Sequence, residues 1–411
     1  MNNMEQGKTF WVVTELFFPE ETSTAYIMTK ISQHLARTRN VNVICGPSSY
    51  QESKIVATEG EELENVKITR VKARKLDKDK LLQRVLRLIT LSLKLSFKLL
   101  RKAKKDDDVL LVTNPAPLLL LAVIICKIRG LKCYTIVHDV FPENMVAANL
   151  IKKDSIPYKI LRRIFNNAYS KMRVLLVLGR DMRLLFEEKL EKYTQRPTIH
   201  VVENWADTET IMPEKKEGNE LIRGLGIENK IIFQFAGNIG RVQGLVELFS
   251  IIRDVKNPLL HFLFIGAGAL KKDLQQFIVL HDLKNISMLD SFPRSRQQEF
   301  LNATDVGIVS LQDDMVGLGV PSKSYNILAA GKPILYIGDS AGEIGLMVNE
   351  HNVGWCFKLQ EREQLLDFFN GFSTASVSEL TTKGERARDL AVNVYAKELI
   401  LNKYAKILTV E

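Results

Sequence analysis

The feature that most constrains the fold of this 411-residue chain is an alternation of apolar strands and amphipathic helices that occurs twice. In the first half, runs rich in Val, Ile and Leu predict strands, and helical patterns lie between most of them. These strands are expected at residues 10–16, 41–46, 66–71, 109–113, 133–138, 174–178 and 199–203. Continuous apolar strands that alternate with helices are typical of a parallel sheet with both faces covered.

The alternation restarts after a polar segment at residues 206–230, which we interpret as a linker. The second set of strands is expected at residues 231–236, 261–265, 286–289, 306–311, 333–337 and 353–357. The pattern predicts an α/β protein with two doubly wound, Rossmann-like parallel-sheet domains and a helical tail. Ligands bind beyond the carboxyl ends of the strands in such sheets, so two facing domains are expected to form a cleft for the chemistry.

Composition excludes several other classes of protein. Apolar residues make up 46% and charged residues 26% of the chain, as in folded globular proteins. The four cysteines are far apart, which excludes a Cys-x-x-Cys zinc or redox motif and favours a reduced, cytoplasmic setting. The longest apolar run, 118–126, has nine residues, whereas a membrane-spanning helix needs about 20, so no such span is expected.

The positive charge of the chain belongs to one segment. Residues 71–105 contain thirteen Lys or Arg and two Asp, a local charge of +11, while the whole chain carries +9. The remaining residues therefore sum to −2, by 9 − 11. This distribution argues against a generally basic nucleic-acid-binding protein.

The basic segment contains a predicted helix at about 78–105 with a cationic stripe at near-helical spacing. The stripe consists of Lys80, Arg84, Arg87, Lys94, Lys98, Arg101 and Lys105. Leucines and other apolar residues fill the remaining faces, as in helices that lie at an anionic membrane interface. A covering helix whose stripe faces water is the alternative. Nucleic acid is a weaker one, because no aromatic residues interleave with the stripe.

A glycine-rich turn opens the second domain. Gly237, Asn238, Gly240 and Arg241 follow a predicted strand and precede a predicted helix. Glycines let backbone N–H groups approach an anion, and an arginine can donate two hydrogen bonds to a phosphate. The alternative is a tight strand-to-helix turn without a ligand. Neither a Gly-x-Gly-x-x-Gly dinucleotide motif nor a Walker loop is present.

A second loop runs from Gly317 into a short helix and contains Ser322, Lys323 and Asn326. A lysine in the first turn of a helix opposes the helix dipole, and a bound anion could offset that cost. We therefore consider a phosphate site here, with a solvated lysine on an ordinary helix as the alternative.

A third cluster follows a strand of the first domain. His138, Asp139 and Glu143 lie where a group is expected to project into the cleft, and they are candidates for general acid or base chemistry. The alternative is a helix N-terminus with locally satisfied side chains. The loop after the first strand contributes Glu15, Thr22, Ser23 and Thr24, of which the last three are also plausible helix caps.

No metal or cofactor is expected from the sequence. The six histidines show no ligand spacing, and the acidic run 106–108 stands at the amino end of a strand, on the wrong side of the sheet for a diphosphate. Capping of the preceding basic helix explains that run better.

Seven segments then appear in a characteristic order: ELFFPEETSTAY, VHDVFPEN, VVENWADTE, FAGNIGRVQGL, FLFIGAGALKKDL, NATDVGIVSL and GVPSKSYNILAAGKPIL. This order resembles the family 4 retaining glycosyltransferases of the GT-B fold. The similarity is greatest to those that build bacterial capsule, O-antigen or colanic-acid-type polysaccharides, including an L-fucosamine-transferase-like subgroup. It covers nearly the whole chain. Leu318 and Asn326 stand where many members have glutamate, and Gln243 stands where a lysine is common.

The resemblance implies two facing domains, an acceptor-binding one at 1–205 and a nucleotide-sugar-binding one at 206–385. A helix at 386–411 would pack back on the first. Gly240, Arg241 and Lys323 would contact the donor diphosphate and Asn326 the ribose or sugar. The base would stack near 290–294, while Asp139, with His138 and Glu143 nearby, would receive the acceptor hydroxyl. Without a metal, Arg241, Lys323 and two helix N-termini would neutralise the leaving diphosphate.

The expected activity is therefore metal-independent hexosyl transfer with retention of configuration, in surface polysaccharide synthesis. The donor would be a nucleotide sugar, with UDP suggested by the family. The acceptor would be a polyprenyl-diphosphate-linked saccharide at an anionic membrane. The protein would be cytoplasmic and peripheral on the inner membrane face, with no nucleic-acid partner. Two alternatives stay open: a nucleotide-sugar 2-epimerase of the same fold, and a non-catalytic membrane-associated homologue.

Overall fold

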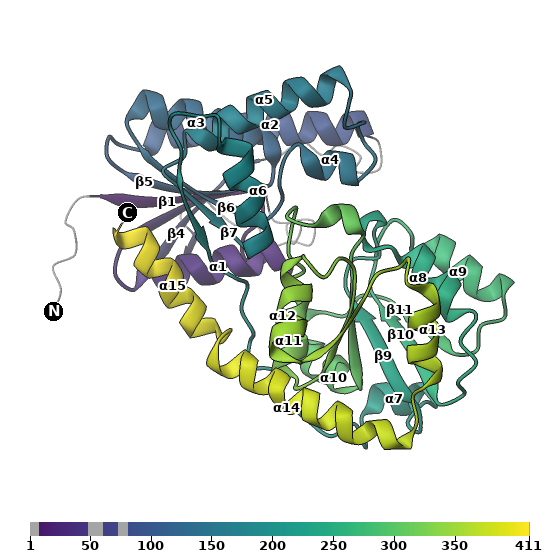
Figure 1. The fold of residues 1–411 in the computed structure, drawn as a ribbon. Helices are drawn as coiled ribbons and strands as arrows, with labels where there is room; N and C mark the ends of the chain where they lie inside the picture. Colours follow the sequence, from purple (N-terminus) through teal and green to yellow (C-terminus); the bar gives the residue numbers. More distant parts are fainter. Residues whose placement is uncertain (1–7, 48–60, 73–80, 411) are drawn as a thin grey trace. The chain divides into compact units, whose positions relative to one another are not determined.

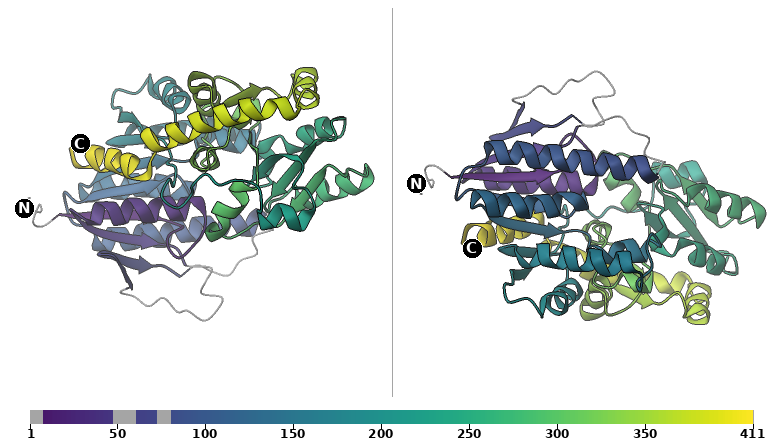
Figure 2. Two further views of the ribbon diagram at one scale, coloured as in Figure 1. Left: turned by 90° about the horizontal axis from the view of Figure 1, so that it is seen from below. Right: turned by 90° about the horizontal axis from the view of Figure 1, so that it is seen from above.

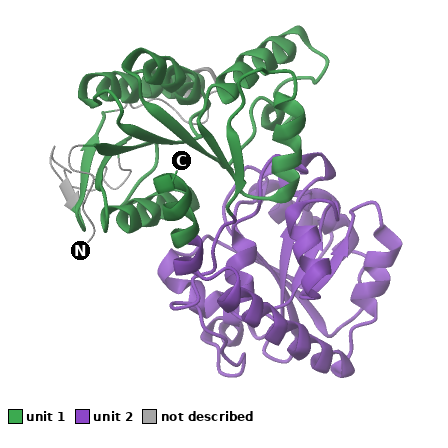
Figure 3. Cartoon of the chain, turned by 60° about the vertical axis from the view of Figure 1, so that its left-hand side comes forward, with its two compact units in different colours: residues 1–202, 401–411 green, residues 203–400 purple. Residues whose placement is uncertain are grey.

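The computed structural model describes residues 8–47, 61–72 and 81–410, and the chain forms two compact units (Figure 3). Unit 1 comprises residues 1–202 and 401–411, and unit 2 comprises residues 203–400. The observed division after residue 202 lies three residues before the expected one. The expected boundary at 385 falls inside helix α14 (Val377–Asn393), whose inner side chains are buried in unit 2, so unit 2 continues to residue 400.

Unit 1 has an eight-stranded sheet in the order β3-β4-β2-β1-β5-β6-β7-β8 (Figure 1). Its strands are β1 (Thr9–Thr14), β2 (Asn40–Cys45), β3 (Glu61–Leu63), β4 (Val66–Arg70), β5 (Asp108–Val112), β6 (Lys132–Val137), β7 (Val174–Val177) and β8 (Thr198–Val201). Every neighbouring pair is parallel except β3 with β4, which confirms the predicted parallel sheet. The short antiparallel β3 was not expected, because three residues carry too little pattern.

Helices cover both faces of this sheet. They are α1 (Ser23–Ala36), α2 (Leu81–Lys102), α3 (Ala116–Arg129), α4 (Glu143–Ala147), α5 (Ile156–Ser170) and α6 (Arg180–Leu190). Helices α2, α3 and α5 lie together on one face, and α1 lies on the other (Figures 1 and 2). The last turns of α15 (Lys397–Val410) also belong to unit 1, where Arg39 Nη1 donates to the carbonyl oxygen of Leu408 at 2.9 Å.

Local sequence explains how these elements begin and end. The Thr22 hydroxyl caps α1 by accepting a hydrogen bond from the backbone N–H of Ala25 at 3.3 Å. Gly130 ends α3 in the left-handed region, at φ 65°. Asp107 accepts from the Trp11 indole and from the Lys104 backbone, both at 2.9 Å. This member of the acidic run is therefore structural, as the sequence suggested.

Unit 2 has a six-stranded parallel sheet in the order β11-β10-β9-β12-β13-β14. Its strands are β9 (Ile231–Ala236), β10 (Leu260–Ile265), β11 (Ile286–Leu289), β12 (Val306–Ser310), β13 (Ile334–Ile337) and β14 (Gly354–Phe357). Its other helices are α7 (Glu220–Leu225), α8 (Leu245–Ile252), α9 (Lys271–Leu280), α10 (Gln297–Asn302), α11 (Lys323–Ala329), α12 (Glu343–His351) and α13 (Arg362–Asn370). Both sheets agree with the predicted doubly wound fold.

Edge-to-face aromatic contacts hold the core of unit 2 together. The ring of Phe233 meets those of Phe369 and Phe372 at centroid distances of 5.3 and 5.1 Å, with interplanar angles near 90°. Such pairs contribute about 0.5–1.5 kcal/mol each beyond the burial of their area. Because Phe233 lies on β9, this cluster makes the strand before the glycine-rich turn a rigid support.

Each sheet has a point where the direction of the strand order reverses. It lies between β1 and β5 in unit 1 and between β9 and β12 in unit 2. Loops that leave the carboxyl ends of strands at such a point diverge and leave room for a ligand. Within the described part of the chain, no helix is both long enough and apolar enough to span a membrane.

Candidate functional site

In unit 2, the two loops that the sequence singled out meet at the reversal point. The glycine-rich turn leaves β9, and the second loop leaves β12. Ser310, the last residue of β12, donates from its hydroxyl to the carbonyl oxygen of Gln243 at 2.6 Å. The backbone N–H of Gln312 donates to the carbonyl oxygen of Val242 at 2.9 Å. These bonds fix the two loops relative to each other.

A pair of glycines after β10 braces the glycine-rich turn. A Cβ on Gly266 would lie 1.9 Å from the carbonyl oxygen of Gly237, and one on Gly268 would lie 2.2 Å from that of Ile239. Only glycine permits this approach. It allows the N–H of Ile239 to donate to the carbonyl oxygen of Ala267 at 2.9 Å. The segment FLFIGAG of the resemblance thus shapes the turn without presenting side chains to a ligand.

Lys323 is the most unusual side chain of unit 2. Its Nζ lies 3.2 Å from the centroid of the Phe235 ring, a cation–π contact, and 3.9 Å from the position that a Cβ on Gly237 would take. Burial holds the pKa of its ammonium well below the usual value. No hydrogen bond or ion pair to this ammonium occurs among residues 8–47, 61–72 and 81–410. An uncompensated cation therefore lies beside the glycine-rich turn.

Arg241, by contrast, is solvent-exposed at the start of a one-turn 3₁₀ helix, Arg241–Gln243. Beside it, the side chains of Asn238 and Gln243 close over Gly240. A Cβ on Gly240 would lie 2.7 Å from Asn238 Nδ2 and 2.8 Å from Gln243 Oε1. Gln243 Oε1 is buried without a hydrogen-bond partner in the described part of the chain. A buried acceptor without a partner costs about 1–3 kcal/mol. Gln243 Oε1 is therefore available to accept a hydrogen bond from a ligand.

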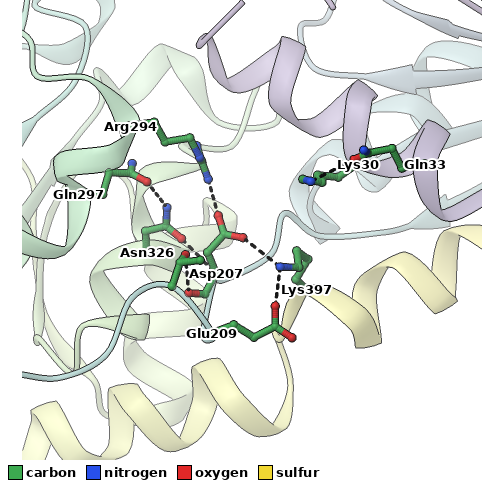
Figure 4. A network of polar contacts seen from close by, with 9 residues as sticks. Lys30, Gln33, Asp207, Glu209, Arg294, Gln297, Asn326 and Lys397 are labelled. Atoms are coloured by element: carbon green, nitrogen blue, oxygen red, sulfur yellow. Dashed lines mark hydrogen bonds and ion pairs between the residues drawn. The ribbon is translucent and has the colours of Figure 1, made fainter. Parts of the chain in front are cut away.

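Of the remaining predicted donor-site residues, Ser322 and Asn326 behave differently. Ser322 precedes α11 and makes no side-chain capping bond, so its hydroxyl is not used by the helix. Asn326 is buried, its Oδ1 accepts from the backbone of Asp207 at 3.1 Å, and its Nδ2 donates to Gln297 at 3.4 Å (Figure 4). Asp207 is also paired with Arg294 (Figure 4). Asn326 thus joins α11 to the segment that begins unit 2.

In unit 1, the structure gathers Asp139 with two amides at the carboxyl ends of β5 and β6. Asn114 Nδ2 donates to one carboxylate oxygen of Asp139, and Asn144 Nδ2 donates to the other, the latter at 2.7 Å. Burial raises the pKa of Asp139, and these two hydrogen bonds oppose the rise. Both partners are neutral, so the carboxylate keeps its negative charge available for a proton or a hydroxyl donor.

The other two predicted residues of this cluster are engaged differently. Burial lowers the pKa of His138 to about 4, so its imidazole is neutral at pH 7, and its Nε2 has no partner in the described part of unit 1. Glu143 pairs with Lys189 Nζ at 2.5 Å and accepts from the Tyr158 hydroxyl at 3.3 Å. The Glu143 charge is thus compensated by a buried lysine.

The loop after β1 is used mainly for structure. Glu15 pairs with Arg87 Nη2 of α2 at 2.9 Å, and its backbone carbonyl accepts from the N–H of Gly46 at 3.0 Å. Thr22 caps α1, as described above, and the side chains of Ser23 and Thr24 lie in the first turn of that helix, exposed and half-buried respectively. All four residues follow a strand that flanks the reversal point of unit 1.

The cationic stripe of α2 is less free than its sequence suggested. Lys80 and the Arg84 side chain lie outside the described residues, and Lys105 lies beyond the end of the helix at Lys102. Arg87 is paired with Glu15, and Lys98 has a polar or electrostatic partner of its own. Lys94 donates to the backbone carbonyl of Lys72 at 2.7 Å, and Arg101 lies 5.7 Å from the centroid of the Phe97 ring. The stripe thus faces partly along the β4 edge of the sheet.

Sequence reasoning missed four residues of these clusters: Asn114, Asn144, Lys189 and Phe235. Asn114 directly follows a buried strand, β5, and this position alone could have identified it. Phe235 and Lys189 carry no such signal, because their partners lie 88 and 46 residues away in the sequence. No group of three or more His, Cys, Asp or Glu side chains that could hold a metal ion occurs among the described residues.

The chain is similar to several known proteins. No family model matches the chain. It is 33% identical over 395 residues to a probable glycosyltransferase, WbjE, from Pseudomonas aeruginosa, covering 96% of each protein. It is 22% identical over 225 residues to a putative colanic acid biosynthesis glycosyl transferase, WcaI, from Escherichia coli K12, covering 54% of each. The crystal structure of Anabaena HepE in complex with UDP superposes with a TM-score of 0.70 at 12% identity, covering 98% of this chain and 100% of that one.

Proposed function

Since the chain belongs to the same glycosyltransferase family as WbjE and has the GT-B fold, we propose that it transfers a sugar from a nucleotide-sugar donor during surface polysaccharide synthesis. Transfer with retention of configuration to a lipid-linked saccharide, on the inner face of the cell membrane, is part of this proposal. The single observation that carries it is Lys323, a desolvated cation without an acidic partner among the described residues, beside a glycine-rich turn.

Unit 2 supplies what a leaving diphosphate needs. Negative charge develops on the phosphate as the glycosidic bond breaks, and a preorganised cation in a poorly hydrated site stabilises it strongly. Lys323 supplies that cation, and the exposed Arg241 adds a second one at the glycine-rich turn. With these groups the chain neutralises the diphosphate by itself, which supports metal-independent transfer. The UDP bound by HepE favours a UDP-linked donor.

Unit 1 supplies a hydrogen-bond acceptor for the incoming hydroxyl. Asp139 is held by two neutral amides, whereas Glu143 is neutralised by Lys189, so Asp139 is the better candidate to orient the acceptor. In a retaining transfer the hydroxyl attacks from the side on which the diphosphate leaves. The leaving phosphate oxygen then takes the proton, and Asp139 positions the hydroxyl rather than acting as a strong base. Neutral His138 lies beside it without adding a cation.

The test is a panel of UDP-, GDP-, dTDP- and ADP-sugars, with thermal shift and calorimetric binding as readouts, in buffer that contains EDTA. We expect one nucleotide class to bind and to raise the melting temperature, and we expect the variant Lys323→Met to lose most of that binding. Incubation of the bound donor without an acceptor separates transfer from epimerisation. A changed sugar configuration without transfer would reject the glycosyltransferase assignment.

A further inference from the structure

The three helices on one face of the unit 1 sheet contain no acidic residue. Helix α3 packs between α2 and α5, so the three form one layer (Figures 1 and 2). They contain 22, 14 and 15 residues, with eleven Lys or Arg and no Asp or Glu. At the average of 48 acids in 411 residues, these helices would contain about six. Composition alone does not explain this absence.

An apolar row runs along the outer side of α5. Ile156, Ile160 and Ile164 recur every fourth residue, and their side chains are 73%, 54% and 43% exposed. Residues at this spacing share one face of a helix. The opposite face, with Phe165 and Tyr169, is buried against the rest of the unit. Three isoleucines in water on one helix face are a costly arrangement unless something covers them.

The neighbouring helices continue the apolar surface. On α3, Ile124 and Ile128 are exposed one turn apart. On α2, four exposed apolar residues recur every fourth position, and they are Val85, Ile89, Leu93 and Phe97. The cations of α2 that bond to Glu15 and to the Lys72 carbonyl turn away toward the β1 loop and β4 edge. The apolar row of α2 therefore lies on the side nearer to α3.

Exposed cations border these apolar rows. Lys159 and Arg163 flank the isoleucines of α5, Lys127 lies between the two isoleucines of α3, and Arg101 lies beside Phe97 on α2. Apolar side chains bordered by Lys and Arg match the interface of an anionic bilayer. There the chains of the cations reach the headgroups and the apolar groups enter the acyl boundary.

We propose that the outer faces of α2, α3 and α5, here called the three-helix face, dock on an anionic lipid bilayer, with the isoleucine row of α5 entering the headgroup layer. The inference deepens the membrane location given under the proposed function but does not depend on sugar transfer. It also shifts the main contact from the cationic stripe of α2, on which the sequence concentrated, to a surface shared by three helices.

Charge decides between a bilayer and a second copy of the chain. A symmetric dimer through the three-helix face would bring its exposed cations, which include Lys127, Lys159 and Arg163, against the same cations of the other copy, with no acid in these helices to compensate. An anionic lipid surface attracts the same charges, by roughly 1 kcal/mol for each cation near it. The face is therefore complementary to lipid and not to itself.

The apolar part is tested by co-sedimentation of the full chain with vesicles of phosphatidylglycerol and phosphatidylcholine. The triple variant Ile156→Ser, Ile160→Ser, Ile164→Ser should bind at least about tenfold more weakly, which corresponds to about 1.4 kcal/mol. The control is Val279→Ser, Leu280→Ser on α9 of unit 2, where two apolar residues that are even more exposed are replaced. It should bind as the unchanged protein does. Unchanged binding of the triple variant would overturn the insertion of α5.

The cationic part is tested in the same assay. Lys159→Glu, Arg163→Glu should weaken binding by at least about tenfold, since each reversal removes one attraction and adds one repulsion. Lys215→Glu, Lys272→Glu, two exposed lysines of unit 2, should leave it unchanged. Equal binding to vesicles of pure phosphatidylcholine would show that the face does not require an anionic surface. If sedimentation velocity showed a dimer of the unchanged protein and a monomer of the triple variant, the face would be assigned to self-association instead.

Measurement of sugar transfer to a soluble acceptor tests the proposed activity without a membrane, so it separates that activity from lipid binding. The triple variant should transfer sugar to such an acceptor as fast as the unchanged protein, because the three isoleucines lie on the exposed face of α5. The α5 residue that contacts Glu143, Tyr158, is buried and stays unchanged. If no donor supports transfer by the unchanged protein or by any variant, the proposed function is wrong. The vesicle assay still tests whether the three-helix face binds lipid.

Discussion

The two candidate clusters desolvate opposite charges. In unit 2, a half-buried lysine lies beside a phenylalanine ring and a glycine-rich turn, and desolvation lowers its pKa. In unit 1, a half-buried aspartate lies between two asparagines, and desolvation raises its pKa. Within the described part of the chain, neither side chain has a counter-ion, and each contacts neutral groups. This contrast supports the proposal that unit 2 binds an anion and that unit 1 binds a hydrogen-bond donor.

Replacement of Lys323 is expected to have the largest effect, and it tests the role of the unit 2 cluster. Lys323→Met should lower kcat/KM by about 10³-fold, because loss of one preorganised electrostatic contact costs about 2.7–4 kcal/mol of transition-state stabilisation. Lys323→Arg should keep part of the activity, since it retains the charge. Initial rates with the donor identified by the binding panel provide the measurement. Full activity of the methionine variant would remove the phosphate assignment.

Replacement of Asp139 probes the other side of the contrast. Asp139→Asn keeps the size of the side chain but removes its charge, and it should lower kcat by about 10²-fold while donor binding stays unchanged. Glu143→Gln serves as the matched control and should have a smaller effect on kcat, because its charge is already neutralised by Lys189. A donor affinity that falls in parallel with kcat would contradict the division of roles.

The pH dependence of stability in acid tests the environment of His138 in unit 1. Burial lowers the pKa of His138 to about 4 in the folded protein, below the usual value of 6.5. Between these pH values the unfolded chain binds more protons, so the free energy of unfolding falls as the pH is lowered. The loss should be about 2 kcal/mol, which is below the full linkage value because the side chain is only half-buried. Urea unfolding of His138→Asn between pH 7 and 4 should show a shallower fall.

The smallest expected effect is on stability at alkaline pH. Burial lowers the pKa of Lys323 in the folded protein. At pH values between this lowered pKa and the usual value of 10.5, the unfolded chain therefore binds more protons than the folded protein does. The free energy of unfolding therefore rises with pH across this window, and Lys323→Met should abolish the rise. It should also raise the melting temperature at neutral pH, since a desolvated charge is removed. A lower melting temperature would show that the cation is compensated in the fold.

The sequence predicted the fold because strand and helix patterns repeat along the chain and depend on neighbouring residues. It singled out the glycine-rich turn and Asp139 because each follows a predicted strand, and Lys323 because it stands in the first turn of a predicted helix. It could not identify Phe235 beneath Lys323 or Asn114 beside Asp139 as partners, because those contacts join distant residues. The isoleucine row of α5 was missed for a different reason: exposure depends on which face of a helix the fold covers, and the pattern alone does not fix it.

The most direct measurement of the central claim is the uptake of protons when a nucleoside diphosphate binds. A bound diphosphate should restore the pKa of Lys323 toward its usual value. Calorimetric titration at alkaline pH, in two buffers of different ionisation enthalpy and with EDTA present, should then show net proton uptake by the unchanged protein and none by Lys323→Arg, whose guanidinium stays charged. Binding without proton uptake in the unchanged protein, or binding only when a divalent metal is added, would contradict the account.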